Sequence, residues 1–332
     1  MKAAVFDEYR PPEVLHLAEL PVPVPGDRDV LVRVRATTVN FGDTLVRGFD
    51  EVTPRRFNMP LLFWLIGRTQ FGWRRPRTRV LGNEFAGEVA AVGRAVTRYA
   101  VGDRVFGYRG PRMGAYAEQL CVPERAVMSR MPTNLTFEEA AAVPYGAIMA
   151  WGLLRKIRVQ SGQRVLVVGA SGGIGAAVVQ LATAELGARV TGVCGTSNLD
   201  QVRALGAEEV IDYTREDFVD RGETYDVIID VLGTRAFADC RRALVAGGRL
   251  VYFSFKARQI LQMLWTSVFG KEKVRCVLVS ETPEDLDAIR RFVEAGTLRV
   301  DVERTFPLAQ AAEAHRYAGS DRRIGAVVIT VP

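Results

Sequence analysis

The stretch Gly169-Ala-Ser-Gly-Gly-Ile-Gly175 contains residues suited to binding a phosphate through backbone N–H groups. Glycines allow the tight turn and the close backbone approach that a pyrophosphate requires. We therefore predict a dinucleotide site in this turn, formed by Ala170, Ser171, Gly172, Gly173, Ile174 and Gly175.

The sequence around the turn places it between a strand and a helix. Residues 164–168 are short and apolar, as in a parallel strand buried on both faces. Residues 176–182 continue as a helix, whose positive N-terminus favours a phosphate, and a second strand is predicted at 188–193. A strand, a glycine turn, a helix and a second strand together indicate a bound dinucleotide.

The end of the second predicted strand indicates NADPH rather than NADH. NAD enzymes place Asp or Glu there, about 20 residues after the glycines, to bind the ribose 2′-hydroxyl. Residues 194–198 contain no acid, and Thr196 and Ser197 offer hydroxyl donors to a 2′-phosphate. Tyr213 is a further candidate donor, although all three could equally be ordinary loop residues.

Composition indicates a globular protein of two domains. The chain has 332 residues and a net charge of +6. A chain of this length usually divides into two domains. The charged N-terminal residues do not form a signal peptide, so we expect a cytoplasmic protein. The four cysteines are scattered and the two histidines are isolated, which disfavours a zinc site. We expect no nucleic-acid partner, because no recognition motif is present.

Local patterns predict two kinds of fold. The first 120 residues are rich in short β-type runs separated by Gly and Pro, which indicates a twisted, barrel-like domain. From residue 138 helices and strands alternate, which predicts a doubly wound parallel sheet in an α/β protein. Residues 275–280 form the predicted last strand, and covering this edge by a second copy would give a homodimer.

Several segments in order resemble the zinc-free quinone oxidoreductase-like branch of the medium-chain dehydrogenase/reductase superfamily. They include residues 39–43, 81–89, 101–106, 114–118, 138–144, the glycine turn and 305–315. The segment between Gly48 and Val80 resembles enone reductases related to chloroplast-envelope quinone oxidoreductases. The resemblance implies a Rossmann-type nucleotide-binding domain at 124–296 and a GroES-like domain at 1–123 and 297–332.

The resemblance also implies zinc-independent hydride transfer from NADPH to a quinone or to the activated C=C bond of an α,β-unsaturated carbonyl. Asn40 matches the loop residue beside the nicotinamide, while Asp43 is expected to brace that loop. Asn40 could instead only cap a turn, and Tyr145 is either a compensating proton donor or a packing residue. Further expected cofactor contacts are Leu232, Gly233, Phe253, Phe255 and Arg322. The alternative function is an NADPH-binding protein with little catalysis, acting as a sensor, a membrane-associated factor or an RNA binder.

Two segments are both basic and apolar. Residues 52–80 contain seven arginines and no acid, and residues 255–275 contain five cations and one acid. We expect a lid over the acceptor pocket. The alternative is that an amphipathic face also contacts an anionic membrane, which would make the protein peripherally membrane-associated.

Overall fold

The computed structural model describes residues 1–9, 11–320 and 325–332. The chain forms two compact units. The first unit contains Met1–Thr53, Leu65–Tyr145 and Thr282–Pro332, and the second contains Pro54–Trp64 and Gly146–Glu281.

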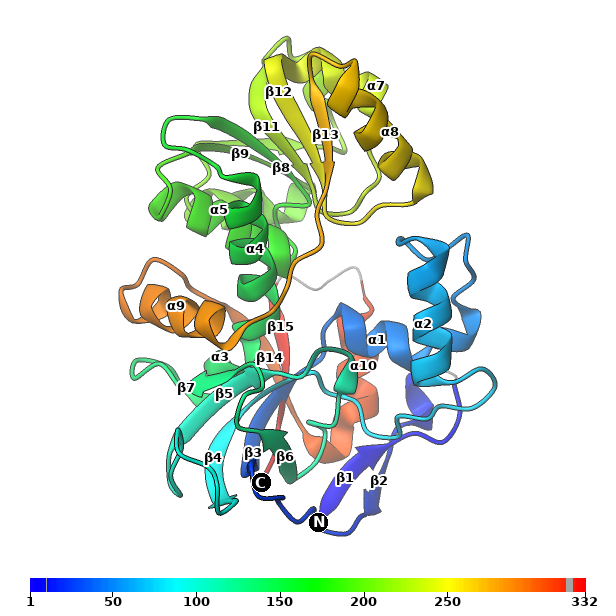
Figure 1. Cartoon of the computed structure of the whole chain (residues 1–332), viewed down its shortest axis with the longest axis vertical. Helices are drawn as coiled ribbons and strands as arrows, with labels where there is room; N and C mark the ends of the chain where they lie inside the picture. Colours follow the sequence, from blue (N-terminus) through cyan, green and yellow to red (C-terminus); the bar gives the residue numbers. More distant parts are fainter. Residues whose placement is uncertain (10, 321–324) are drawn as a thin grey trace. The chain divides into compact units, whose positions relative to one another are not determined.

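The second unit is built on six strands that pair in parallel, in the order β10-β9-β8-β11-β12-β13 (Figure 1). The order runs outward in both directions from β8, so the predicted doubly wound sheet is confirmed. The strands are β8 (Arg164–Val168), β9 (Arg189–Cys194), β10 (Glu209–Asp212), β11 (Tyr225–Asp230), β12 (Leu244–Tyr252) and β13 (Lys273–Cys276).

Helices precede or connect most of these strands. They are α4 (Pro144–Ile157), which starts in the first unit, α5 (Gly173–Ala184), α6 (Leu199–Ala204), α7 (Phe237–Cys240) and α8 (Ala257–Val268). Helix α8 lies beside β13, where the Val274 N–H donates to the Thr266 hydroxyl at 3.0 Å (Figure 1). Strand β13 ends at Cys276, although the sequence predicted a last strand to residue 280. One further bond, from Val277 N–H to the Tyr252 carbonyl, follows the strand before the pairing ends.

The tight packing of α5 against β8 requires one particular glycine. A Cβ atom at Gly175 would lie 2.0 Å from the Gly169 carbonyl oxygen, far inside van der Waals contact. Gly169 itself has φ +85°, which L side chains rarely adopt. The buried, uninterrupted apolar side chains of Val165–Val168 anchor the strand beneath the turn.

The first unit contains a seven-stranded sheet in the order β14-β15-β3-β4-β5-β7, with β6 paired to β3, and a separate pair β1-β2. The predicted β domain is confirmed. Its strands are β1 (Lys2–Val5), β2 (His16–Glu19), β3 (Asp29–Thr38), β4 (Glu84–Val92), β5 (Arg104–Tyr108), β6 (Gln119–Pro123), β7 (Met128–Arg130), β14 (Val302–Pro307) and β15 (Ala326–Thr330). Its helices are α1 (Phe41–Arg47), α2 (Leu61–Phe71), whose first residues group with the second unit, α3 (Phe137–Ala142), α9 (Pro283–Glu294) and α10 (Ala311–Ala318).

The units divide at different residues from those the sequence predicted. Residues 124–145 and 282–296 belong to the first unit, whereas 54–64 belong to the second. Helix α9 is tied to β7 and to the chain that follows it: the Ser129 hydroxyl donates to Asp287, and Asn134 donates to the Val293 carbonyl at 3.0 Å. These long-range bonds, rather than the change in local pattern, set the boundary.

Candidate functional site

The glycine turn of the second unit is open where a phosphate would approach. Gly172 is the N-cap of α5, in an extended conformation and without a side-chain cap. A Cβ atom at Gly173 would meet nothing within 4 Å. Ser171, Gly172 and Gly173 reach the surface, whereas Ala170, Ile174 and Gly175 are buried and shape the turn. These residues therefore fit a pyrophosphate held by backbone N–H groups at a helix N-terminus.

A second loop, residues 231–235, is held by the buried carboxylate of Asp230. Its oxygens accept N–H bonds from Leu232 (3.1 Å), Gly233 (2.9 Å) and Arg235 (2.8 Å). Burial raises the pKa of Asp230, while these bonds oppose the rise. Gly233 has φ +70°, and a Cβ atom there would lie 2.1 Å from the Ser254 carbonyl. The loop containing two predicted cofactor contacts is thus rigidly placed.

The other predicted contacts occupy different environments. Phe253 is half-buried, whereas Phe255 packs in the hydrophobic core of the second unit. Ser197 and Tyr213 are exposed, but the Thr196 hydroxyl donates its hydrogen to Asp212 at 2.6 Å. In this conformation Thr196 can only accept a bond from a ligand. Arg322 lies outside the described residues.

In the first unit, Asn40 is the N-cap of α1. Its side-chain oxygen accepts N–H bonds from Gly42 (2.9 Å) and Asp43 (3.4 Å), and the Asp43 carboxylate completes a capping box. Its amide nitrogen donates to Glu84 at 2.9 Å and to the Asn83 side-chain oxygen. Asn40 therefore caps a helix and at the same time uses both amide hydrogens within the protein.

Glu84 is the centre of this polar cluster, and the sequence did not reveal its role. Its carboxylate is buried and accepts bonds from the Thr38 hydroxyl, the Asn40 amide and the Tyr145 N–H, the last at 2.7 Å. Burial raises the pKa of Glu84, and the donors counteract this rise. The predicted site residue Tyr145 thus contacts the cluster through its backbone, and its ring lies 5.8 Å from that of Tyr108, centroid to centroid. The local sequence around Glu84, an Asn and a Glu after a glycine, gave no signal that these donors meet at its carboxylate.

Asp43 has the contacts expected of a brace. It is fully buried and accepts N–H bonds from Asn40 (3.0 Å) and Gly82 (2.9 Å), which joins the start of α1 to the loop before β4. Burial raises the pKa of Asp43 to about 7, opposed by these bonds and reinforced by the nearby Glu84.

The two histidines occupy different environments. His16 is exposed, whereas His315 is buried and contacts the Tyr116 hydroxyl at 3.0 Å, so it is part of the packing. In the described ranges, no group of three His, Cys, Asp or Glu side chains could hold a metal ion.

Comparison with known proteins assigns the family. Residues 26–133 match the alcohol dehydrogenase GroES-like domain, and residues 205–329 match the zinc-binding dehydrogenase family model. The chain is 31% identical to a quinone oxidoreductase of Pseudomonas aeruginosa, with 99% of each chain covered. It is 29% identical to the chloroplastic NADPH-dependent alkenal/one oxidoreductase of Arabidopsis thaliana, covering 99% of this chain and 79% of the relative.

A solved structure agrees with these relatives. The quinone oxidoreductase of Coxiella burnetii superposes with a TM-score of 0.85 at 27% identity, covering 100% of this chain and 99% of that one. The chain belongs to the quinone oxidoreductases of the medium-chain dehydrogenase/reductase superfamily, which are nicotinamide-dependent oxidoreductases.

Several arginines of the first basic segment, residues 52–80, make contacts within the protein. The Arg68 guanidinium is buried, donates to the Asp50 carbonyl at 3.0 Å and lies 5.1 Å from the centroid of the Phe49 ring. Arg77 donates to the Thr69 carbonyl at 2.7 Å, and Arg79 pairs with Asp7 at 2.6 Å. Three of the seven arginines therefore support local structure.

Residues 54–64 are attached to the loop that Asp230 organises. Asn58 donates to the Leu232 carbonyl at 2.9 Å, and Lys256 donates to the Arg55 carbonyl at 2.6 Å. Met59 packs against the hydrophobic core of the second unit. The segment thus lies beside predicted cofactor contacts, as a lid over the acceptor would.

We predict that Asp43 makes stability fall as the pH rises from about 4 to about 7. The folded state keeps the proton to a higher pH than the unfolded state, whose Asp has its ordinary pKa of 3.8, so unfolding releases protons in this window. The slope can reach about 1.4 kcal/mol per pH unit. Urea unfolding at pH 5, 6, 7 and 8 should show this slope in the wild type and a smaller one in Asp43→Asn.

The exposed Asp200 supplies the control, since Asp200→Asn should keep the wild-type slope. Equal slopes in the wild type and Asp43→Asn would show that the Asp43 carboxyl does not hold a proton in the folded protein.

Proposed function

We propose that this protein uses NADPH to reduce quinones or α,β-unsaturated carbonyl compounds without zinc. The observation that carries the proposal is the open glycine turn on a doubly wound parallel sheet, in a chain that resembles quinone and enone reductases along its whole length. NADPH bound there supplies a hydride. The residues predicted to hold it are those of the turn, Leu232 and Gly233, and those around Thr196 and Tyr213.

The role of the first unit is to present a preorganised amide. The Asn40 side chain is fixed by the helix cap and by Glu84, so it cannot rotate freely. Its position in the family motif suits orientation of the nicotinamide or of an acceptor carbonyl. Donation to either requires one amide hydrogen of Asn40 to leave Glu84 or Asn83, while Asp43 holds the loop. Such fixed dipoles favour charge that develops in the transition state.

NADPH rather than NADH is the proposed cofactor. The turn after β9 contains no acid, and Asp212, the carboxylate that its Thr196 hydroxyl contacts, is engaged by hydroxyl donors of the protein. A turn that lacks an acid and exposes the Ser197 hydroxyl accommodates a 2′-phosphate better than a turn with a free carboxylate would.

A homodimer formed along β13 is part of the proposal. Strand β13 is the last of the sheet and, among the described strands, it pairs only with β12. An unpaired edge in a β-sheet usually requires cover, and pairing of two copies about a two-fold axis supplies it.

A peripheral membrane contact is a second proposal, favoured by the surface of α8. No helix in the described part of the chain is long and apolar enough to cross a bilayer. On α8, however, Leu261, Leu264, Trp265 and Val268 are 56% to 71% exposed at helical spacing, followed by Phe269 at 74%. Arg258, Lys271 and Arg275 are also exposed, and the single acid of this segment, Glu272, pairs with Arg241 at 2.9 Å. An apolar face bordered by cations complements an anionic bilayer.

The central prediction is that the protein catalyses the proposed reaction. NADPH oxidation should be measurable with a panel of quinones and enones, faster than with NADH and unchanged by EDTA. Asn40→Ser keeps a capping hydroxyl but removes the amide, and should lower kcat/KM by about tenfold or more, as loss of one oriented dipole does.

Asn40→Ala removes both functions and also loses about 1 kcal/mol of helix capping. Full activity of Asn40→Ser would limit Asn40 to capping. NADPH binding without turnover of any acceptor would favour the non-catalytic alternative.

For assembly, light scattering at micromolar concentration should return twice the mass of one chain. A monomer mass across this range would contradict pairing through β13.

For the membrane contact, co-sedimentation with phosphatidylserine-containing vesicles should exceed that with pure phosphatidylcholine and fall with added salt. Trp265→Ser with Leu264→Ser should weaken binding by about fivefold or more, because apolar burial is lost. Val24→Ser, at an exposed apolar residue elsewhere, is the control. Equal recovery with neutral and anionic vesicles would refute the contact, and a change of mass in the α8 variant would assign its face to a second copy instead.

A further inference from the structure

The acid that is missing from the turn after β9 is supplied by the neighbouring strand. Strands β9 and β10 pair in parallel, which places Asp212 opposite Cys194. The Thr196 hydroxyl, at the start of the turn, donates to Asp212 Oδ2 at 2.6 Å. A carboxylate therefore lies beside the turn that is predicted to bind the ribose of the cofactor, although the turn itself contains no acid.

This carboxylate is occupied by the protein itself. Asp212 Oδ1 accepts the Thr214 N–H at 3.0 Å and the Thr214 hydroxyl at 2.7 Å, and the side chain is only 7% exposed. The Thr196 hydrogen bond, followed by that of Thr214, lowers the pKa of Asp212, so the group is anionic at neutral pH. It anchors the turn, but it also places a negative charge beside any bound 2′-phosphate.

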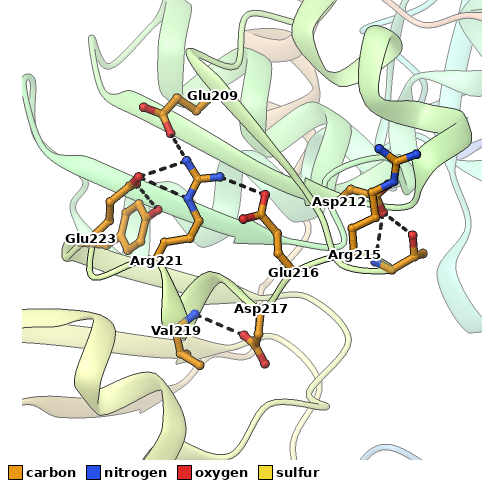
Figure 2. A network of polar contacts seen from close by, with 10 residues as sticks. Glu209, Asp212, Arg215, Glu216, Asp217, Val219, Arg221 and Glu223 are labelled. Atoms are coloured by element: carbon orange, nitrogen blue, oxygen red, sulfur yellow. Dashed lines mark hydrogen bonds and ion pairs between the residues drawn. The ribbon is translucent and has the colours of Figure 1, made fainter.

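Arg215 is the cation placed to offset that charge. Its Nε lies 3.7 Å from Asp212 Oδ2, and its side chain is 77% exposed (Figure 2). Within the described part of the chain this is the one polar contact of its side chain. Exposed pairs of this kind are weak, so the guanidinium can turn toward a ligand at little cost. A guanidinium also offers several N–H donors in a geometry that suits phosphate.

The loop that contains Arg215 is fixed at both ends. Its start is held by the Tyr213 N–H, which donates to the Cys194 carbonyl at 3.1 Å. Its far end is held by Arg221, which contacts Glu209 on β10 at 3.4 Å, Glu216 at 3.1 Å and Glu223 at 3.1 Å (Figure 2). The backbone of Arg215 is therefore held next to the ends of β9 and β10, and only its side chain needs to move.

We propose that Arg215 determines cofactor specificity by binding the 2′-phosphate of NADPH. The proposal rests on the proposed nicotinamide-dependent function and identifies the cation that the turn itself lacks. The 2′-phosphate carries the charge that a guanidinium recognises, whereas the 2′-hydroxyl of NADH leaves Arg215 beside Asp212. Arg215 thus contributes to the binding of one cofactor and leaves the other unaffected.

The test compares ligands that differ only at the ribose 2′ position. Dissociation constants of the full chain are measured for 2′,5′-ADP and 5′-AMP, and for NADPH and NADH. The variants are Arg215→Gln, the charge-conserving Arg215→Lys, and Arg189→Gln. Arg189 is a matched control, because it is similarly exposed and pairs with Glu208 at 2.8 Å at the opposite end of β9. Thermal unfolding confirms that each variant folds.

Arg215→Gln should weaken 2′,5′-ADP and NADPH by about tenfold or more, as expected for loss of a charge-assisted bond, with 5′-AMP and NADH within about twofold. Arg215→Lys should retain part of the affinity, and Arg189→Gln all of it. The proposal is overturned if the ratio of the dissociation constants within a pair, 2′,5′-ADP to 5′-AMP or NADPH to NADH, is the same in Arg215→Gln as in the wild type. Equal weakening of both ligands is one form of this result. A wild type that binds no 2′,5′-ADP would also overturn it. A wild type that binds NADPH and NADH equally would also contradict a role of Arg215 in specificity. Turnover of quinones with either cofactor tests the proposed reaction separately.

Discussion

Carboxylates withdrawn from water organise the loops on which function depends. A carboxylate has about four acceptor positions, and burying it without partners costs several kcal/mol. Asp43 and Glu84 in the first unit, and Asp212 and Asp230 in the second, therefore fix the conformation of any backbone that supplies their donors. The same physical requirement therefore holds the loops around all four carboxylates in place.

The source of the donors distinguishes these carboxylates. Asp43 and Asp230 accept mainly backbone N–H groups, so they fix the backbone of their loops directly. Glu84 and Asp212 accept side-chain hydrogens as well, and so determine what those side chains can offer a ligand. Asn40 and Thr196 are consequently oriented groups whose hydrogen-bonding capacity is already partly used.

The sequence was sufficient to predict the parts of the structure that depend on local pattern. Strand β8 is a continuous apolar run, and Gly175 follows from the close approach of a helix to this strand. Helix α9 also has local start signals, the N-cap Thr282 and Pro283 at its first position. The sequence was insufficient where strand register determines which residues meet. Asp212 reaches Thr196 only through the pairing of β9 with β10. In the same way, Glu84 reaches Asn40 across 44 residues, and no spacing rule indicates that contact.

Composition alone also suggested more unpaired positive charge in residues 52–80 than remains after folding. Arg68 donates to backbone carbonyls and Arg79 pairs with Asp7, so neither is available to an external anion. The planar guanidinium is well suited to such internal roles, which lysine fills less well. The apolar residues of α8 differ in kind, because the side chains of Leu264 and Trp265 remain exposed after folding. The fold therefore accounts for part of the unusual composition at 52–80, whereas the exposed face of α8 still requires a partner.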